Sequence, residues 1–194
     1  MKRYLLFGVC AVWLGVHIGA AAEESKEITR DKSPDGKFAL EITKEDEGWS
    51  AAIIDLKTKR EMVSLEIYQN YTEEAHLVWS KDSQRVAYFE PDRRGGGTTV
   101  YFRNADKFEA VDLPEIPECK IRRTNGEDYV KTIESTTRAE KWLSAGALVL
   151  KAHSDLLMEK GDDQYSKTCT QIVTVAFDAN RKASVQSAKR TKSD

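Results

Sequence analysis

The sequence predicts an all-β domain built as an antiparallel meander of hairpins, either open or curled into a sandwich or barrel. Short segments rich in Val, Ile, Thr, Phe and Tyr recur along the chain, and clusters of Gly, Pro, Asn, Asp and Ser separate them. The composition suits a folded domain, since 40% of the 194 residues are hydrophobic and 32% are charged. A formal net charge of −2 argues against a nucleic-acid-binding protein, which is normally basic.

The first 22 residues have the pattern of a secretory signal peptide. Basic Lys2 and Arg3 precede 16 residues without Asp, Glu, Lys or Arg, and Ala20–Ala22 then supplies small residues before a polar segment. We expect cleavage after Ala22 and export to the periplasm or the medium. The alternative is an uncleaved anchor, although the apolar run is shorter than the roughly 20 residues of a membrane span. Only in that case is a membrane partner expected.

Residues 23–194 are expected to form one β-rich domain. Alternating apolar and polar residues predict strands near Ile28 and at Phe38–Ile42, Trp49–Leu56, Met62–Ile67, Leu77–Trp79, Arg85–Phe89, Thr98–Arg103 and Phe108–Leu113. The turn before the second strand, Ser33–Lys37, carries the strongest signal, because Pro34 fixes φ and Gly36 accepts a positive φ. Pro91–Gly97 is expected to be a loop.

The C-terminal third is less regular, and hairpins are expected between residues 119 and 186. Pro114 and Pro117 mark a module boundary. Residues with β-branched side chains favour a strand at Tyr129–Trp142, although part of that segment would suit a helix. Further strands are expected at Ala147–Ala152, Thr168–Phe177 and Ala183–Val185. The polar tail from Ser187 is expected to fray.

Two segments, Ser33–Leu40 and Val78–Tyr88, share a turn followed by a strand, and Ser80 lies 47 residues after Ser33. The pattern resembles the repeats of TolB-type and WD-related β-propellers, whose blades recur at about 40–45 residues. The resemblance covers about residues 33–113, with a weaker echo at Trp142–Leu150. It implies propeller-like hairpins but no particular function, because such repeats serve many roles.

A complete propeller is not expected, because a closed ring needs about four to eight blades and the chain offers two or three units. Each unit exposes an apolar face that only a neighbouring unit can cover. The expected architecture is therefore an open, propeller-like meander curled into a sandwich or barrel. A compact four-unit ring with degenerate copies and an assembly with other chains are the alternatives.

Cys119 and Cys169 are the two cysteines outside the expected signal peptide. An even pair in an oxidising compartment favours a disulfide, which would close a loop of 50 residues. Two reduced, buried thiols are the alternative. Because histidines do not cluster with the two cysteines, a zinc site is not expected. No other metal site and no cofactor are expected either.

One short segment contains two arginines followed by three glycines and could bind a small anion. Its residues are Arg93, Arg94, Gly95, Gly96 and Gly97. Two guanidinium groups beside free backbone N–H groups suit a phosphate or a carboxylate. The run is not a P-loop, because the Lys-Ser/Thr ending and the following helix are absent. The simpler interpretation is a hairpin loop exposed to water.

No catalytic arrangement stands out in the sequence. His76 and His153 have no metal-binding neighbour at a suitable spacing, and packing beside Trp79 is the simpler role for His76. Three carboxylates in Glu159–Asp163 lack the spacing of a calcium loop. Neither a Gly-x-Ser-x-Gly nor a His-Glu-x-x-His motif occurs. We therefore expect a protein without enzymatic activity.

Three functions stay open. The preferred one is an exported, non-enzymatic protein whose hairpins or sheet edges bind another envelope protein or an envelope polymer. The second is the binding of a small anion at Arg93 and Arg94. The third is a hydrolase with loop carboxylates such as those of Glu90 and Asp92, and it requires two carboxyl groups that face each other across a cleft.

Overall fold

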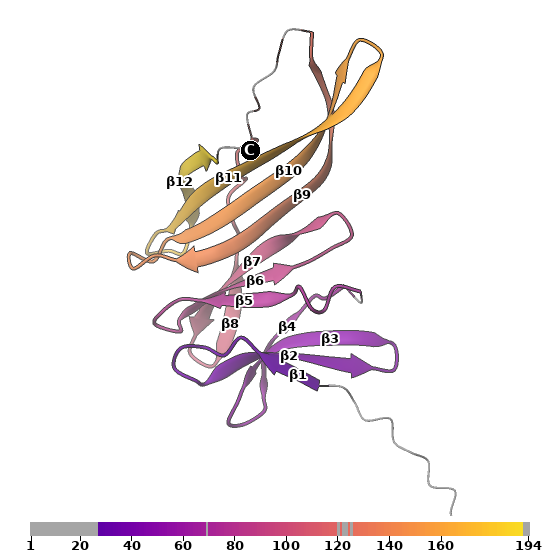
Figure 1. Ribbon diagram of the computed structural model, residues 1–194. Helices are drawn as coiled ribbons and strands as arrows, with labels where there is room; N and C mark the ends of the chain where they lie inside the picture. The colour runs from indigo at the N-terminus through magenta and orange to yellow at the C-terminus, as the bar shows by residue number, and fades with distance from the viewer. Residues whose placement is uncertain (1–26, 69, 120, 122–123, 125, 192–194) are drawn as a thin grey trace, which may run out of the picture.

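The computed structural model describes residues 27–68, 70–119, 121, 124 and 126–191 (Figure 1). Within these ranges the regular secondary structure consists of β-strands alone, which confirms the all-β class. In the same ranges, no helix is long and apolar enough to cross a membrane. The expected signal peptide and its cleavage site after Ala22 lie outside the described residues.

The strands form three consecutive units, each an antiparallel meander (Figure 1). Unit I contains β1 (Glu27–Arg30), β2 (Phe38–Glu45), β3 (Gly48–Asp55) and β4 (Glu61–Leu65). Unit II contains β5 (His76–Trp79), β6 (Arg85–Glu90), β7 (Gly95–Asn104) and β8 (Lys107–Val111). Unit III contains β9 (Asp128–Trp142), β10 (Leu148–Lys160), β11 (Asp163–Phe177) and β12 (Ala183–Arg190). A short parallel contact between β7 and β9 joins units II and III, and the described strands close no barrel.

Unit III is more regular than the sequence predicts. The strand expected at Ala147–Ala152 continues to Lys160, and β11 starts at Asp163, because the two strands pair in unbroken register along their whole length. The expectation of a frayed tail from Ser187 is wrong. β12 continues to Arg190, because its backbone pairs with β11 although its side chains stay mostly exposed.

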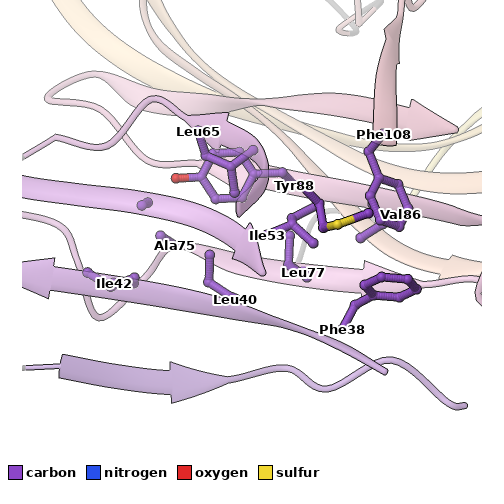
Figure 2. Packing of buried hydrophobic residues seen from close by; sticks show 12 residues of the cluster. Phe38, Leu40, Ile42, Ile53, Leu65, Ala75, Leu77, Val86, Tyr88 and Phe108 are labelled. Carbon is purple, nitrogen blue, oxygen red and sulfur yellow. The ribbon is translucent and has the colours of Figure 1, made fainter. Parts of the chain in front are cut away.

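Unit II lies between units I and III and is buried on both faces. Successive residues of its strand β6 point in opposite directions, so Tyr88 joins a core shared with unit I and Ala87 joins a core shared with unit III. The first core, shown in Figure 2, includes Phe38, Leu40, Ile42, Ile53, Leu65, Ala75, Leu77, Val86 and Phe108. The second includes Val100, Ala139, Leu148, Leu150, Ala152, Val173 and Val175. Each unit therefore covers the apolar face of the next, as stacked repeats do.

The two repeat turns are built by the same hydrogen bonds. Ser33 Oγ donates to Asp35 Oδ1 at 2.7 Å, and Ser80 Oγ donates to Asp82 Oδ1 at 2.6 Å. Each aspartate also accepts a backbone N–H from the residue two positions later. Burial acts to raise the pKa of both aspartates, but these hydrogen bonds outweigh it and hold each pKa below its ordinary value.

Two tryptophans tie each unit to the preceding one. Trp79 Nε1 donates to the Asp31 carbonyl at 2.6 Å, and Trp142 Nε1 donates to the Val78 carbonyl at 2.9 Å. Asp31 and Val78 occupy the same position, two residues before the turn serine of their own repeat. The weak echo at Trp142–Leu150 therefore starts with a tryptophan that is structurally equivalent to Trp79.

Candidate functional site

The linker between β8 and β9, described at residues 112–119, 121, 124, 126 and 127, lies against the inner face of unit III and is held there by β11. Its contacts come from four inward-facing residues at alternate positions of β11, namely Tyr165, Lys167, Cys169 and Gln171. Gln171, which is buried, donates from Nε2 to the Pro117 carbonyl. Regular strand alternation thus turns one strand into a row of attachment points.

The middle of the linker is attached by the Cys119–Cys169 disulfide, in agreement with the pairing expected from the sequence. The two Cα atoms lie 6.1 Å apart, within the usual range for a disulfide. Cys169 is fully buried beside Leu156 and Met158, and Ile121 packs against them. The linker therefore covers the part of unit III that projects beyond unit II.

The end of the linker is anchored by Glu127. Its carboxylate accepts from Lys167 Nζ and from the Thr124 backbone N–H, both at 2.6 Å. The bond from Lys167, followed by the nearby Tyr165 hydroxyl, holds the pKa of Glu127 far below its ordinary value. The same carboxylate raises the pKa of Tyr165 to about 12. Neither Glu127 nor Tyr165 exchanges protons near neutral pH, so these two residues and Lys167 serve to anchor the linker.

A cleft of about 840 Å³ lies between the linker and the β9 side of unit III. Linker residues form one wall, and residues of β9 and β10 form the floor. The lining residues are Pro117, Glu118, Cys119, Ile121, Asp128, Tyr129, Thr132, Ser154 and Leu156. Within the described ranges, no three His, Cys, Asp or Glu side chains are grouped as a metal ion would require. The mixed lining suits a polypeptide segment, which also has polar and apolar groups.

The edge of β9 beside this cleft has no strand partner among the described residues. From Asp128 to Glu134, β9 pairs only with β10. From Ser135 the same edge is bonded to unit II, because Ser135 N donates to the Arg94 carbonyl at 3.1 Å and Gly95–Gly96 continues in parallel. We call residues 128–134 the β9 lane. It is about 20 Å long at the usual rise per residue.

The β9 lane is exposed, and it combines large apolar residues with charged ones, including Lys131 at its centre. Tyr129, Val130 and Ile133 are 49%, 40% and 46% exposed, and they are three of the five large hydrophobic residues exposed in the described structure. Val130 and Ile133 fall at register shifts, where an extra residue interrupts the pairing with β10. The opposite edge of unit III, β12, has exposed Lys189 and Arg190, and charges of this kind oppose strand pairing. The lane also carries exposed charges, at Asp128, Lys131 and Glu134, and it differs from β12 in its three large exposed apolar residues.

The predicted anion-binding run lies at one end of the β9 lane, but its glycines are not in the expected loop. Gly95, Gly96 and Gly97 open strand β7, so the loop predicted at Pro91–Gly97 is shorter than expected. A Cβ atom on Gly95 would lie 2.1 Å from the Ser135 carbonyl oxygen, and one on Gly96 would lie 2.5 Å from a backbone oxygen. These glycines therefore allow close approach of neighbouring chain segments.

Arg93 and Arg94 are exposed at the tip of the β6–β7 hairpin. The Arg94 backbone N–H donates to Asp92 Oδ1, so this N–H already has an acceptor. The two guanidinium groups make no hydrogen bond, ion pair or ring contact with the described residues. The structure places both arginines beside the end of the lane, and anion binding by them stays a prediction.

The structure gives His76 and Trp79 contacts within the fold. The His76 ring lies 5.3 Å from the Phe89 ring, and its Nδ1 lies 3.4 Å from Arg138 Nη2. Trp79 stacks on Phe38 in the first core, in addition to its bond across units. Neither residue lines the cleft.

His153 lies between Thr170 and Asp155 on the outer face of unit III and, among the described residues, is hydrogen-bonded only to Thr170. Its Nδ1 lies 2.9 Å from Thr170 Oγ1, and its Nε2 lies 3.3 Å from Asp155 Oδ1. The order of hydroxyl, imidazole and carboxylate is that of a catalytic triad, but none of the three residues lines the cleft. His153 and Thr170 are direct partners across β10 and β11, so their hydrogen bond is a cross-strand contact.

The carboxylates considered for a hydrolase lie near one another. Burial, followed by the charges of Glu66 and Asp92, raises the pKa of Glu90. Glu90 lines neither the cleft nor a smaller hollow of about 360 Å³ beside the turn at Asp82. These carboxylates therefore form a cluster outside both concave surfaces.

Sequence reasoning did not find the β9 lane. The strand at Tyr129–Trp142 is predicted, but the pattern of one segment does not reveal whether its edge has a partner. The sequence does contain one sign of the lane. Tyr129, Val130 and Ile133 are large apolar residues in a strand whose exposed residues are otherwise polar.

No protein-family model and no curated protein sequence matches the chain. Among solved structures, the chain is similar to the crystal structure of TolB from Acinetobacter baumannii, with a TM-score of 0.37 and 10% sequence identity. The similarity covers 86% of this chain and 43% of that chain, so this chain spans less than half of the other protein's length. It is a weak resemblance of fold and carries no conclusion about function.

Proposed function

We propose that this protein is an exported, non-enzymatic binding module that accepts an extended segment of another envelope protein along the β9 lane. The observation that carries the proposal is a free strand edge with exposed Tyr129, Val130 and Ile133 beside a cleft. An extended segment that pairs with such an edge gains backbone hydrogen bonds, and pockets beside the edge select its side chains.

Export is supported by the leader pattern that ends at Ala22 and by the Cys119–Cys169 disulfide. Disulfides persist in oxidising compartments and are rare where thiols are kept reduced. The partner would therefore be a protein of the same compartment.

The absence of enzymatic activity is supported by the positions of the titratable groups. His153, Asp155 and Thr170 lie on an open sheet face, and Glu90 lines neither hollow. The strongest pKa shift near the cleft belongs to Glu127, whose bond to Lys167 keeps it ionised. A general acid or base instead needs a pKa near the working pH.

The test uses peptides of eight residues displayed as a library and selected against the folded protein. Selected peptides are then titrated into the wild type and into the double variant Val130→Lys/Ile133→Lys, which gives the lane the charges that protect natural sheet edges. The matched control is Leu143→Lys, because Leu143 is also 40% exposed but directly follows the far end of β9, at Trp142. Unfolding free energies of the variants should stay within about 0.5 kcal/mol of the wild type.

We expect the dissociation constant to rise at least tenfold in the double variant and to stay unchanged in Leu143→Lys. Equal dissociation constants for the wild type and the double variant would show that the peptides do not bind at the lane. Sedimentation of the free protein gives a second check. A dimer that the double variant dissociates would mean that a second copy of the chain occupies the lane, and this also contradicts the proposal.

A further inference from the structure

The β9 lane has charges of opposite sign at its two ends. At the end next to Ser135, the backbone carbonyl of Arg94 bonds to β9 where the pairing with β7 begins, and the side chains of Arg93 and Arg94 are exposed and without a partner among the described residues. At the other end, Glu118 lines the cleft, and Asp128 borders it although its pairing with Glu159 puts its side chain on the face of Glu134. Between the two ends lie the exposed apolar residues of the lane and Lys131, whose partner on β10 is Leu157, on the face opposite the cleft.

The carboxylate of Glu134 is close to Arg93 and Arg94 in the chain order of the lane, but it does not lie on the face of the sheet that carries the cleft. Glu134 pairs with Asp155, whereas the next residue of β10, Ser154, lines the cleft. Because side chains alternate between faces, Asp155 and Glu134 belong to the opposite face of the sheet. On the face of the sheet that carries the cleft, β9 therefore places no carboxylate at the arginine end of the lane.

From this charge arrangement we infer that the lane takes its partner strand parallel to β9 and ends it at a carboxylate held by Arg93 and Arg94. The inference rests on the function proposed above. A strand parallel to β9 runs from Asp128 towards Ser135, so its C-terminal end reaches the arginines. An antiparallel strand would bring its N-terminal end there and, where that end is a free amine, would set like charges together.

The course of β7 supports the parallel direction. Gly95 and Gly96 already pair with Ser135 and Thr136 in parallel, and the Arg94 carbonyl bonds Ser135 N. A parallel partner in the lane therefore lies in line with β7 and stops where β7 begins. Guanidinium groups bind carboxylates through paired, charge-assisted hydrogen bonds, which are stronger than neutral ones. The partner class is thus a β-forming segment with a basic start, an apolar middle and a free C-terminal or acidic end.

The probe is a synthetic peptide of eight residues that begins with lysine and continues with alternating valine and threonine. It is made with a free C-terminal carboxylate and, separately, with a neutral carboxamide. Both forms are titrated into the wild type, into Arg93→Glu/Arg94→Glu, and into Lys44→Glu/Lys57→Glu. The last variant changes the net charge equally at two exposed lysines of unit I.

We expect the carboxylate form to bind the wild type about tenfold more tightly than the carboxamide, as the loss of one charge-assisted contact implies. The difference should disappear in Arg93→Glu/Arg94→Glu and persist in Lys44→Glu/Lys57→Glu. A nitroxide at the peptide C-terminus should broaden the amide signals of residues 94–96, and one at the N-terminus those of residues 128–129.

Two results would overturn the inference and leave the lane as a binding site. One is equal affinity of both peptide forms, with both weakened by Val130→Lys/Ile133→Lys. The other is broadening of residues 94–96 by the label at the N-terminus. If neither form binds, and no library peptide depends on Val130 and Ile133, the proposed function itself fails.

Discussion

Units I and II differ from unit III in how far their strands extend. The strands of unit II have 4 to 10 residues, whereas β9 and β11 of unit III have 15 each. Units I and II therefore match in size and cover each other, while the outer half of unit III projects beyond unit II (Figure 1). The projecting half is where the cleft and the free edge of β9 lie. The difference shows that a stack of repeats gains a free surface when the strands of one repeat are longer than those of its neighbour.

The two halves of unit III are held by different interactions. The inner half packs its fully buried Leu148, Leu150, Val173 and Val175 against unit II. The projecting half depends on the Cys119–Cys169 disulfide and on the bond from Lys167 to Glu127. This comparison leads to tests that separate the two halves.

Removal of the disulfide is expected to have the largest effect. The double variant Cys119→Ser/Cys169→Ser should lose about 4 kcal/mol of unfolding free energy, because the cross-link closes a loop of 50 residues in the unfolded chain. Urea unfolding followed by circular dichroism measures this loss. Reduction of the wild type should have the same effect, and a loss below about 1 kcal/mol would show that the linker is held mainly by its other contacts.

Truncation of core leucines comes next. Leu150→Ala should destabilise the protein by about 3 kcal/mol, since Leu150 is fully buried between units II and III. Leu156→Ala should have a smaller effect of about 2 kcal/mol, because the linker that covers Leu156 can settle into the space. The same unfolding measurement applies, and the reverse order of the two values would contradict the contrast between the halves.

The bonds that tie the units together are expected to contribute less. Trp79→Phe and Trp142→Phe each remove one hydrogen bond to the backbone of the preceding unit, at the Asp31 and the Val78 carbonyl. Each variant should lose about 1 kcal/mol of unfolding free energy. Similar losses in thermal or urea unfolding would show that the two positions are equivalent. A loss at Trp79 alone would mean that unit III is not joined as a repeat.

The anchor at Glu127 should give the smallest effect and one that depends on pH. Its folded pKa is depressed, so its contribution to stability is present above the unfolded value of 4.5 and is lost as the pH falls below it. Glu127→Gln should therefore be less stable than the wild type at pH 6, and the difference should shrink between about pH 4.5 and 3. A difference that stays constant over this range would contradict the bond from Lys167.

Local patterns in the sequence predict much of this fold. The turn at Ser33–Lys37 and its second copy before β6 are visible because their residues bond within a few positions of one another. The extension of β10 to Lys160 is not visible, because polar residues at His153–Asp155 interrupt the apolar run and pairing with β9 and β11 holds the segment as a strand. Local preference gives way there to contacts between distant parts of the chain.

The candidate site could be predicted only in part. Arg93 and Arg94 stand out in the sequence, and the structure locates them beside the free edge. Their neighbours Gly95 and Gly96 suggest a flexible loop, whereas the structure uses them where a side chain would collide with other backbone. The lane itself arises because β7 ends its pairing at Ser135, and no local pattern encodes where a distant strand stops.

Amide hydrogen exchange of the full chain, with and without the peptide of alternating valine and threonine, tests the central claim most directly. We expect the peptide to slow exchange in residues 128–134, since a partner strand would bond the backbone groups that now face solvent. Exchange in β12 and in unit I should not change. Binding that leaves residues 128–134 unprotected, or that protects another sheet edge instead, would contradict the account.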